Sequence, residues 1–177
     1  NFLTSGQEPV RRGNAHPNIV PYDAFECSDG HFLLAVGNDA QFARLCDAIG
    51  LTDISGDDRF TTNQARIDNR TALMELIRPA MRGFPKETLL AMLHAVNVPC
   101  GPINTVSEAL TSEQAQARGA VVDVRHDDVQ GGLLRLLGNP LKLSQTPIRY
   151  ERAPPRFGQD TDEVLETWGP QSAHQNT

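Results

Sequence analysis

The chain has 177 residues, of which 39% are hydrophobic, and a formal net charge of −6. This length suits one domain or slightly more, with enough apolar residues for a core. The acidic balance argues against a nucleic-acid partner, because such proteins usually carry a basic stripe, and against an anionic membrane surface. No apolar run reaches the roughly 18 residues that span a bilayer, so we expect no membrane partner.

The cysteines and histidines exclude two further kinds of site. Three cysteines, Cys27, Cys46 and Cys100, form no C-x-x-C motif. A disulfide-stabilised secreted protein would need more of them, so the sequence predicts a reducing, cytoplasmic setting. The five histidines include no pair at i, i+4 spacing, and we expect no metal. Cys100 lies between Pro99 and Gly101 without a basic neighbour, and we interpret it as a packed structural thiol.

The two ends of the sequence show little regular pattern. Residues 1–16 are polar, contain glycine and proline, and predict a linker. The chain starts at Asn1 without the basic and apolar regions of a signal peptide, and we expect this start to be a boundary within a longer polypeptide. We expect residues 171–177 to be frayed.

Residues 17–104 carry the signals of a small domain. Asp29-Gly30 separates two short apolar runs and is a strong hairpin signal. Apolar residues then recur at helical spacing after a capping turn at Gly37-Asn38-Asp39. Asn69 is a candidate cap for a second helical segment, and Pro85 suits the first turn of another helix. The predicted elements are strands at 20–27 and 31–36 and helices at 42–49, 67–81 and 85–96.

The segment Val98–Asn104 predicts a stiff corner. Pro99 and Pro102 bracket a Cys-Gly pair directly after an apolar helical run. Each proline fixes its own φ near about −65° and moves the preceding residue out of the helical region. The chain must therefore leave its helix and run extended here.

Residues 105–177 show shorter predicted elements and a proline-rich passage, and we interpret them as a connecting and return segment. The predicted elements are helices at 106–110, 113–118 and 160–168 and strands at 120–126 and 133–137. Arg149, Arg152 and Arg156 lie in and just after a proline-rich passage. Their guanidinium groups could contact a phosphate or carboxylate, but ion pairs are equally available, and we favour the ion pairs. The candidate partners are Glu151, Asp160 and Asp162.

Several motifs follow one another in an order that is typical of one enzyme family. They are Arg12-Gly13-Asn14-Ala15-His16 with Val20-Pro21-Tyr22, Ser28-Asp29-Gly30, Gly37-Asn38-Asp39 with Gln41-Phe42, Phe60-Thr61-Thr62-Asn63, Arg66, Asn69-Arg70, Pro99-Cys100-Gly101-Pro102, Ala153-Pro154-Pro155, Gly158-Gln159 and Thr161-Asp162-Glu163-Val164-Leu165. With these motifs, nearly the whole chain resembles the C-terminal half of the family III CoA-transferases (CaiB/BaiF family), which include formyl-CoA transferase.

The resemblance implies an α+β fold. Residues 17–104 would form a small domain of a β-hairpin plus several helices, and residues 105–177 would return to pack on a Rossmann-like large domain that nothing in this chain matches. It also implies that the full-length parent is an interlocked homodimer.

The resemblance implies an activity as well. Enzymes of this family exchange CoA between a thioester and a free carboxylic acid through an aspartyl-CoA intermediate, which divides one hard step into easier ones. The nucleophilic aspartate belongs to the large domain, so no catalytic residue is assigned to this chain, and we expect the chain alone to be inactive. The implied partners are acyl-CoA, with coenzyme A as substrate, and a small carboxylic acid such as succinate.

One loop can be carried over from the family as a candidate site. In formyl-CoA transferase a glycine-rich loop at the start of the small domain covers the reacting carbonyl. The matching substrate-binding loop here consists of Gly13, Asn14, Ala15 and His16, with one glycine instead of a run. It looks more like the version in members that act on dicarboxylic or branched acyl groups. Backbone amides, or the Asn14 or His16 side chain, could donate hydrogen bonds to an acyl carbonyl, although a loop histidine such as His16 is more often a solvated or structural residue.

Two alternative functions stay open. The first is an α-methylacyl-CoA racemase of the same superfamily, which would use acid–base residues on the large domain. The second is a non-catalytic binding or assembly half of a split transferase, which would fold and bind a partner without turnover.

Overall fold

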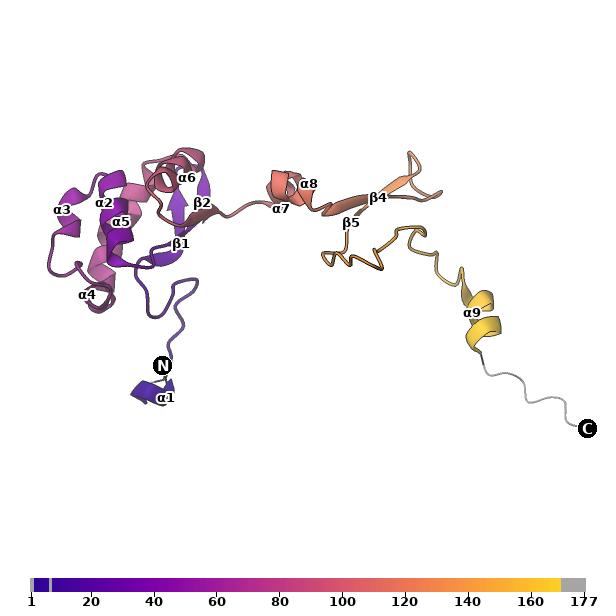
Figure 1. Ribbon diagram of the computed structural model, residues 1–177, viewed down its shortest axis with the longest axis horizontal. Helices are drawn as coiled ribbons and strands as arrows, with labels where there is room; N and C mark the ends of the chain where they lie inside the picture. The colour runs from indigo at the N-terminus through magenta and orange to yellow at the C-terminus, as the bar shows by residue number, and fades with distance from the viewer. Residues whose placement is uncertain (1, 7, 170–177) are drawn as a thin grey trace, which may run out of the picture. The chain divides into compact units, whose positions relative to one another are not determined.

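The computed structural model describes residues 2–6 and 8–169. The chain separates into two compact units, Asn1–Asn104 and Thr105–Thr177 (Figure 1). The frayed end that the sequence predicts at 171–177 lies outside the described residues. Within the stretch predicted as a linker, a short helix, α1, spans Phe2–Ser5.

The first unit is built on a three-stranded antiparallel sheet of order β1-β2-β3. β1 (Tyr22–Cys27) and β2 (Gly30–Ala35) form the predicted hairpin. β3 (Cys100–Pro102) pairs with β2, where the sequence predicted only an extended corner. Proline is tolerated here because β3 lies at an edge of the sheet. The corner therefore closes the sheet as well as turning the chain.

Helices accompany this sheet in the first unit. They are α2 (Asp39–Ala48), α3 (Thr52–Ser55), α4 (Asn63–Asp68), α5 (Arg70–Arg82) and α6 (Lys86–Ala95). α5 packs on β1, and α6 packs on β2 and β3. The helices predicted at 42–49, 67–81 and 85–96 are confirmed, with the middle one divided between α4 and α5, whereas α3 was not predicted.

The helix ends show one confirmed cap and two corrections. Asn38 caps α2, because its side-chain oxygen accepts a hydrogen bond from the amide of Gln41 at 2.9 Å. Asn69 does not cap α5; its side-chain amide donates back to the carbonyl of Ala65 at 3.0 Å and so closes α4 instead. Pro85 lies at the N-cap of α6 with extended backbone, one residue before the predicted first turn. Each residue marks a helix boundary from just outside the helix.

A continuous apolar core fills the first unit. The rings of Phe25 and Phe32 face each other across β1 and β2 with their centroids 5.9 Å apart. The buried core residues are Val20, Phe25, Cys27, Phe32, Leu34, Val36, Phe42, Leu45, Cys46, Ile49, Phe60, Leu73, Ile77, Met81, Leu89, Leu93 and Val98. Burying each large apolar side chain stabilises a fold by about 1.5–3 kcal/mol, so this set favours a unit with its own cooperative stability.

The second unit contains short elements joined by long connections. They are α7 (Val106–Thr111), α8 (Glu113–Ala117), β4 (Val121–Arg125), β5 (Leu133–Leu137) and α9 (Thr161–Trp168). β4 and β5 pair antiparallel, with Asp123 opposite Arg135. The elements predicted in this region are confirmed to within two residues at each end.

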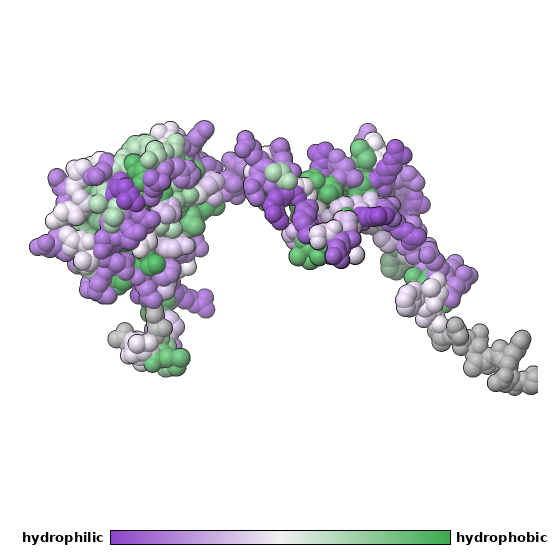
Figure 2. All heavy atoms as spheres, in the orientation of Figure 1, coloured by the Kyte–Doolittle hydropathy of each residue, from purple (hydrophilic) through white to green (hydrophobic). Residues whose placement is uncertain are grey.

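The second unit has almost no core of its own. Among the described residues of this unit, Val124 alone has a buried apolar side chain. Large apolar side chains lie outside instead: Leu137 is 72% exposed, Trp168 84% and Phe157 fully exposed. Figure 2 shows such apolar atoms, in green, on the surface of this unit.

No helix in the part of the chain that the structure describes is long and apolar enough to cross a bilayer.

Candidate functional site

The predicted loop lies in the first unit, shortly before β1, and begins with a turn. Gly13 has a φ of +63°, a left-handed conformation that favours glycine. The amide of Ala15 donates to the carbonyl of Arg12 at 3.2 Å and closes the turn. Gly13 and Asn14 are exposed, whereas Ala15 is half-buried. The tip of the turn is therefore open to solvent.

His16, at the end of the loop, is fixed by both its backbone and its ring. Its amide donates to the carbonyl of Tyr22 at 2.8 Å, and its ring stacks on the Tyr22 ring with centroids 5.2 Å apart and planes inclined by 20°. Its Nδ1 accepts a hydrogen bond from the amide of Asn18 at 3.1 Å. The imidazole is half-buried and held in one orientation.

Side chains of α4 and α5 hold the backbone that follows the loop. Arg70 Nη2 donates to the carbonyls of His16 at 2.8 Å and Pro17 at 3.1 Å. Asn63 Nδ2 donates to the carbonyl of Asn18 at 2.9 Å, and Asn63 Oδ1 accepts from the amide of Val20 at 3.2 Å. We call Asn63 and Arg70 the loop clamp. It connects residues 16–20 to the helices more than forty residues later.

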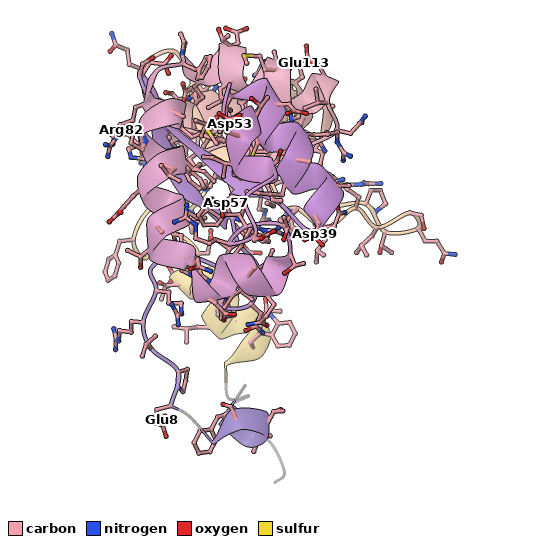
Figure 3. The ribbon with its side chains drawn as sticks, turned by 90° about the vertical axis from the view of Figure 1, so that its left-hand side faces the viewer. Glu8, Asp39, Asp53, Asp57, Arg82 and Glu113 are labelled. Atoms are coloured by element: carbon pink, nitrogen blue, oxygen red, sulfur yellow. The ribbon has the colours of Figure 1, made fainter. Side chains whose placement is uncertain are left out.

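Arg66 lies fully buried below the loop clamp and anchors three segments. Its Nε donates to the carbonyl of Val20 at 2.7 Å and its Nη1 to that of Phe60 at 2.8 Å. Its Nη2 pairs with Asp39 Oδ1 at 2.7 Å, at the start of α2 (Figure 3). The guanidinium also lies 4.4 Å from the centroid of the Phe42 ring. A buried charge with this many partners is a structural anchor.

The surroundings of the loop clamp are cationic. Burial lowers the pKa of Arg70, and the nearby Arg12 lowers it further, while Asp23 acts in the opposite direction. An open hollow of about 400 Å³ lies beside it, lined by Arg12 and residues 67–72. Asp68 is the acidic residue of this lining, so the hollow carries more positive than negative charge.

Several carboxylates of the first unit are already engaged. Hydrogen bonds from the Arg59 side chain hold the pKa of Asp57 below its usual value, and the ion pair measures 2.6 Å. Asp23 is buried and pairs with Arg78 at 2.7 Å. The backbone amide of Lys86 lowers the pKa of Asp29. Each of these three carboxylates is therefore held by a donor of the first unit itself.

The thiols are equally unsuited to nucleophilic chemistry. Burial raises the pKa of Cys46 to about 12 and also raises the pKa values of Cys27 and Cys100. A thiol that keeps its proton at neutral pH is a poor nucleophile and a poor metal ligand. Cys100 is half-buried, as expected for a packed thiol. Within residues 2–6 and 8–169, no group of three or more His, Cys, Asp or Glu is placed to hold a metal ion.

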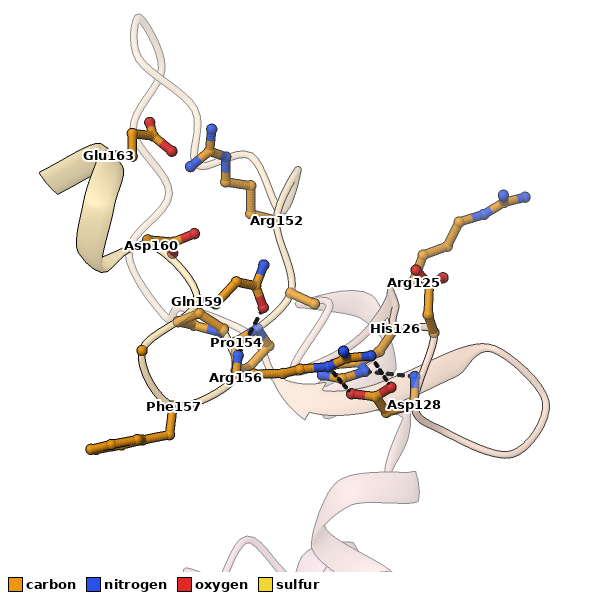
Figure 4. Close-up of a pocket in the computed structure, with 14 residues that line it drawn as sticks. Arg125, His126, Asp128, Arg152, Pro154, Arg156, Phe157, Gln159, Asp160 and Glu163 are labelled. Atoms are coloured by element: carbon orange, nitrogen blue, oxygen red, sulfur yellow. Dashed lines mark hydrogen bonds and ion pairs between the residues drawn. The ribbon is translucent and has the colours of Figure 1, made fainter. Parts of the chain in front are cut away.

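The second unit has a larger hollow, of about 730 Å³, between the turn after β4 and residues 152–163 (Figure 4). Arg156 forms a forked ion pair with Asp128 in it, rather than with the predicted Asp160 or Asp162, because the β4–β5 turn brings Asp128 close. Figure 4 shows Arg152 pointing toward Glu163. The charges that line the hollow are Arg125, Arg152 and Arg156 against Asp127, Asp128, Asp160 and Glu163. This balance gives it no selectivity for a phosphate.

Arg149 lies outside this hollow. It pairs with Glu151 at 3.4 Å, both side chains being exposed, which confirms the ion-pair interpretation for this residue.

In the sequence, the loop clamp and Arg66 were recognised only as parts of the family motifs, and no role was predicted for them. Asn63 and Arg66 lie in α4, and Arg70 is the first residue of α5. The predicted helix began at residue 67, so helical spacing did not join these three residues, and their places in the family motifs were the available signal. What the sequence could not show is that the partners are carbonyl groups of residues 16–20.

Comparison with known proteins decides the family. The family model described as CoA-transferase family III matches residues 1–161. The chain belongs to this family. This confirms the resemblance drawn from the motifs.

Curated relatives of the chain are CoA-transferases. Succinate–glutarate CoA-transferase of Agrobacterium fabrum is 42% identical over 165 residues, which cover 93% of this chain and 41% of that protein. Acetyl-CoA:oxalate CoA-transferase of Acetobacter aceti is 35% identical over 151 residues, which cover 85% of this chain and 37% of that protein. The chain thus spans about two fifths of the length of these relatives.

A solved structure shows the same fold. The crystal structure of a CaiB/BaiF family protein from Brucella suis matches with a TM-score of 0.79 at 36% identity, covering 94% of this chain and 42% of that one. The α+β fold class inferred from the sequence is therefore confirmed.

Proposed function

We propose that this chain is part of an acyl-CoA:carboxylate CoA-transferase that moves CoA from succinyl-CoA to a second small dicarboxylate. The observation that carries this is the 42% identity with the succinate–glutarate CoA-transferase of Agrobacterium fabrum over 93% of the chain. The loop at residues 13–16, with one glycine followed by asparagine, alanine and histidine, supports a dicarboxylic acyl group.

The proposed mechanism uses an aspartate supplied outside residues 1–177. Its carboxylate attacks the thioester carbonyl of succinyl-CoA and expels CoA thiolate, which leaves a mixed anhydride. The thiolate then attacks the aspartyl carbonyl, succinate departs, and an aspartyl-CoA thioester remains. The acceptor carboxylate attacks this thioester and expels CoA thiolate, which leaves a second mixed anhydride. The thiolate then attacks the acceptor's carbonyl in that anhydride, so that the acceptor leaves as its CoA thioester and the aspartate carboxylate is restored.

Two observations support placing the nucleophile elsewhere. The chain spans 41% of the Agrobacterium fabrum relative, so most of that enzyme is not represented in it. The carboxylates of Asp23, Asp29 and Asp57 are held by arginine or by a backbone amide. We propose that the complete enzyme is a homodimer in which the first unit carries the loop toward the acyl group.

The loop would serve the reaction by donating hydrogen bonds to the acyl group. Charge develops on the thioester oxygen when the carboxylate attacks, and preorganised donors lower the barrier to that step. The open tip at Gly13 and Asn14 and the fixed imidazole of His16 supply such donors at one place.

A hybrid enzyme tests this proposal. The segment of the Agrobacterium fabrum relative that matches this chain is replaced by the corresponding residues of this chain, and CoA transfer from succinyl-CoA to glutarate is followed by chromatography of the two thioesters. We expect glutaryl-CoA to form with the hybrid and not with the 177-residue chain alone. A hybrid that folds and assembles like the parent but forms no glutaryl-CoA contradicts the proposal.

Different measurements, of α-proton exchange and of partner binding, separate the two alternative functions from CoA transfer. A racemase would exchange the α-proton of a 2-methylacyl-CoA with solvent deuterium and leave CoA on its acyl group. A non-catalytic half would bind its partner chain without either reaction. Turnover by the 177-residue chain alone would contradict the placement of the nucleophile outside it.

A further inference from the structure

The loop clamp has a feature that ordinary packing does not require. Arg70 uses Nη2 for two successive carbonyls, at 2.8 Å to His16 and 3.1 Å to Pro17, and is half-buried. Among the described residues, no carboxylate forms an ion pair with it. A half-buried guanidinium that lies near a second arginine and has no carboxylate partner costs free energy, so a simple surface role does not explain its place.

The carbonyl groups that Arg70 holds belong to His16 and to the next residue, Pro17. The His16 carbonyl is held by Arg70 and its amide by Tyr22, so its backbone is fixed on both sides. The next fixed point is Asn18, whose carbonyl accepts from Asn63 and whose amide reaches back to His16 Nδ1 at 3.1 Å. The loop clamp therefore holds the carbonyls of residues 16–18, and the Asn18 amide within this segment donates to the imidazole.

The hydrogen bond from the Asn18 amide sets the tautomer of the His16 ring. A backbone amide can only donate, so Nδ1 must accept with its lone pair, and the proton of the neutral imidazole lies on Nε2. Stacking on Tyr22 fixes the plane of the ring. His16 thus presents a single donor of defined direction, next to the open turn at residues 13–15.

We propose that Arg70, supported by Asn63, is a positioning residue that holds His16 with Nε2–H as the hydrogen-bond donor for an oxygen atom of the bound acyl group. This inference rests on the proposed function. The oxygen belongs either to the thioester carbonyl or to the remote carboxylate of a dicarboxylic acyl group, and both offer the same acceptor chemistry.

Nuclear magnetic resonance on the full chain tests the positioning role without any activity. At about pH 8, where an ordinary imidazole is neutral, long-range ¹H–¹⁵N correlations report the tautomer of His16. We expect the Nε2–H form in the native chain, and in Arg70→Met a mixture of tautomers with about tenfold faster hydrogen exchange at the Asn18 amide. An unchanged tautomer and unchanged exchange in Arg70→Met overturn the proposal.

Matched variants keep this test interpretable. Arg82→Met removes another α5 arginine, which pairs with Glu26 at 2.8 Å on the outer side of the helix (Figure 3), and should leave His16 unchanged. Asn63→Asp retains the acceptor for Val20 but loses the donor to Asn18, and should speed hydrogen exchange at the Asn18 amide. This variant keeps the test available if Arg70→Met fails to fold. Arg70→Lys should restore the Nε2–H form in part, because lysine can donate to a carbonyl.

Kinetics of the hybrid enzyme then test the link between the two residues. If Arg70 acts through His16, Arg70→Met and His16→Ala each lower kcat/KM, and the double variant is no worse than His16→Ala alone. Effects that multiply in the double variant overturn the proposal. A native hybrid without activity contradicts the proposed function instead, while the tautomer measurement still decides the role of Arg70.

The choice of thioester identifies the acceptor oxygen. A loss in His16→Ala with succinyl-CoA but not with acetyl-CoA places Nε2–H at the remote carboxylate. A loss with both places it at the thioester carbonyl, and a loss with neither overturns the donor role.

Discussion

The two units of this chain differ in where they keep their apolar side chains. In the first, phenylalanine, leucine and isoleucine side chains from the sheet and helices form one buried core, and even an arginine is enclosed with all of its charge partnered. In the second, Val124 is buried, whereas Leu137, Phe157 and Trp168 lie exposed. The difference indicates that the first unit is stabilised by its own core, whereas the second unit leaves large apolar side chains on its surface.

This contrast fits a division of labour within a CoA-transferase. A self-stabilised unit can hold a loop in a defined geometry, as the loop clamp and Arg66 do here. A segment with exposed apolar side chains is suited to docking, because burying them on a partner contributes free energy at about 25 cal/mol per Å² of apolar surface.

The largest expected effect comes from separating the units. We expect residues 1–104 alone to unfold cooperatively in urea with dispersed amide resonances, and residues 105–177 alone to show no cooperative transition. The reason is that nearly all buried apolar side chains of the described chain belong to the first unit. A cooperative transition in the isolated second unit would contradict the comparison.

Removing the buried cation should destabilise the first unit strongly. Arg66→Met leaves the carbonyls of Val20 and Phe60 and the carboxylate of Asp39 without their donor. Each buried acceptor left without its donor costs about 1–3 kcal/mol, whereas the exposed Asp39 carboxylate adds little, so the unfolding free energy measured in urea should fall by at least that amount. The exposed Arg82→Met is the control and should change stability by less than about 1 kcal/mol.

Matched leucine truncations should separate the two units. Leu73→Ala in α5 removes a fully buried side chain and should cost about 2–5 kcal/mol in unfolding free energy. Leu137→Ala in β5 removes a side chain that is 72% exposed and should change the stability of the chain by less than about 0.5 kcal/mol. Equal losses from the two variants would show that the second unit has a core of its own.

Alkaline pH should weaken the first unit through Cys46. Its folded pKa is about 12, against an ordinary 9.0, because the thiol is buried. Between these values the unfolded chain has released the proton and the folded chain keeps it, so stability falls as pH rises, by about 1.4 kcal/mol per pH unit for this group. The free energy of unfolding should fall more between about pH 8 and about pH 10 in the native chain than in Cys46→Ala. An equal fall in the two proteins would contradict this prediction.

The sequence predicted most of the fold because its signals are local. The Asp29-Gly30 turn, the Asn38 cap and the helical spacing of apolar residues each act within a few positions. β3 was missed because a three-residue edge strand depends on hydrogen bonds to β2, some seventy residues earlier, and its prolines point away from a strand. The prediction of Asp160 or Asp162 as the partner of Arg156 was wrong for the same reason, because its actual partner, Asp128, is 28 residues away.

The candidate loop was found through its motif, whereas its support was not. Gly13–His16 are consecutive, so the sequence places them together. The contacts of Arg70 with His16 and of Asn63 with Asn18 join segments 54 and 45 residues apart. Asn63 lies in α4 and Arg70 in α5, and only the fold shows that both helices meet the loop.

The most direct test of the account is to locate the covalent intermediate in the hybrid enzyme. The hybrid is incubated with succinyl-CoA without acceptor, quenched and digested, and the peptide that carries CoA as a thioester is identified by mass spectrometry. The account predicts an adduct on an aspartate outside the segment supplied by this chain, with a lower yield in Arg70→Met. An adduct on a carboxylate within residues 1–177 would contradict it.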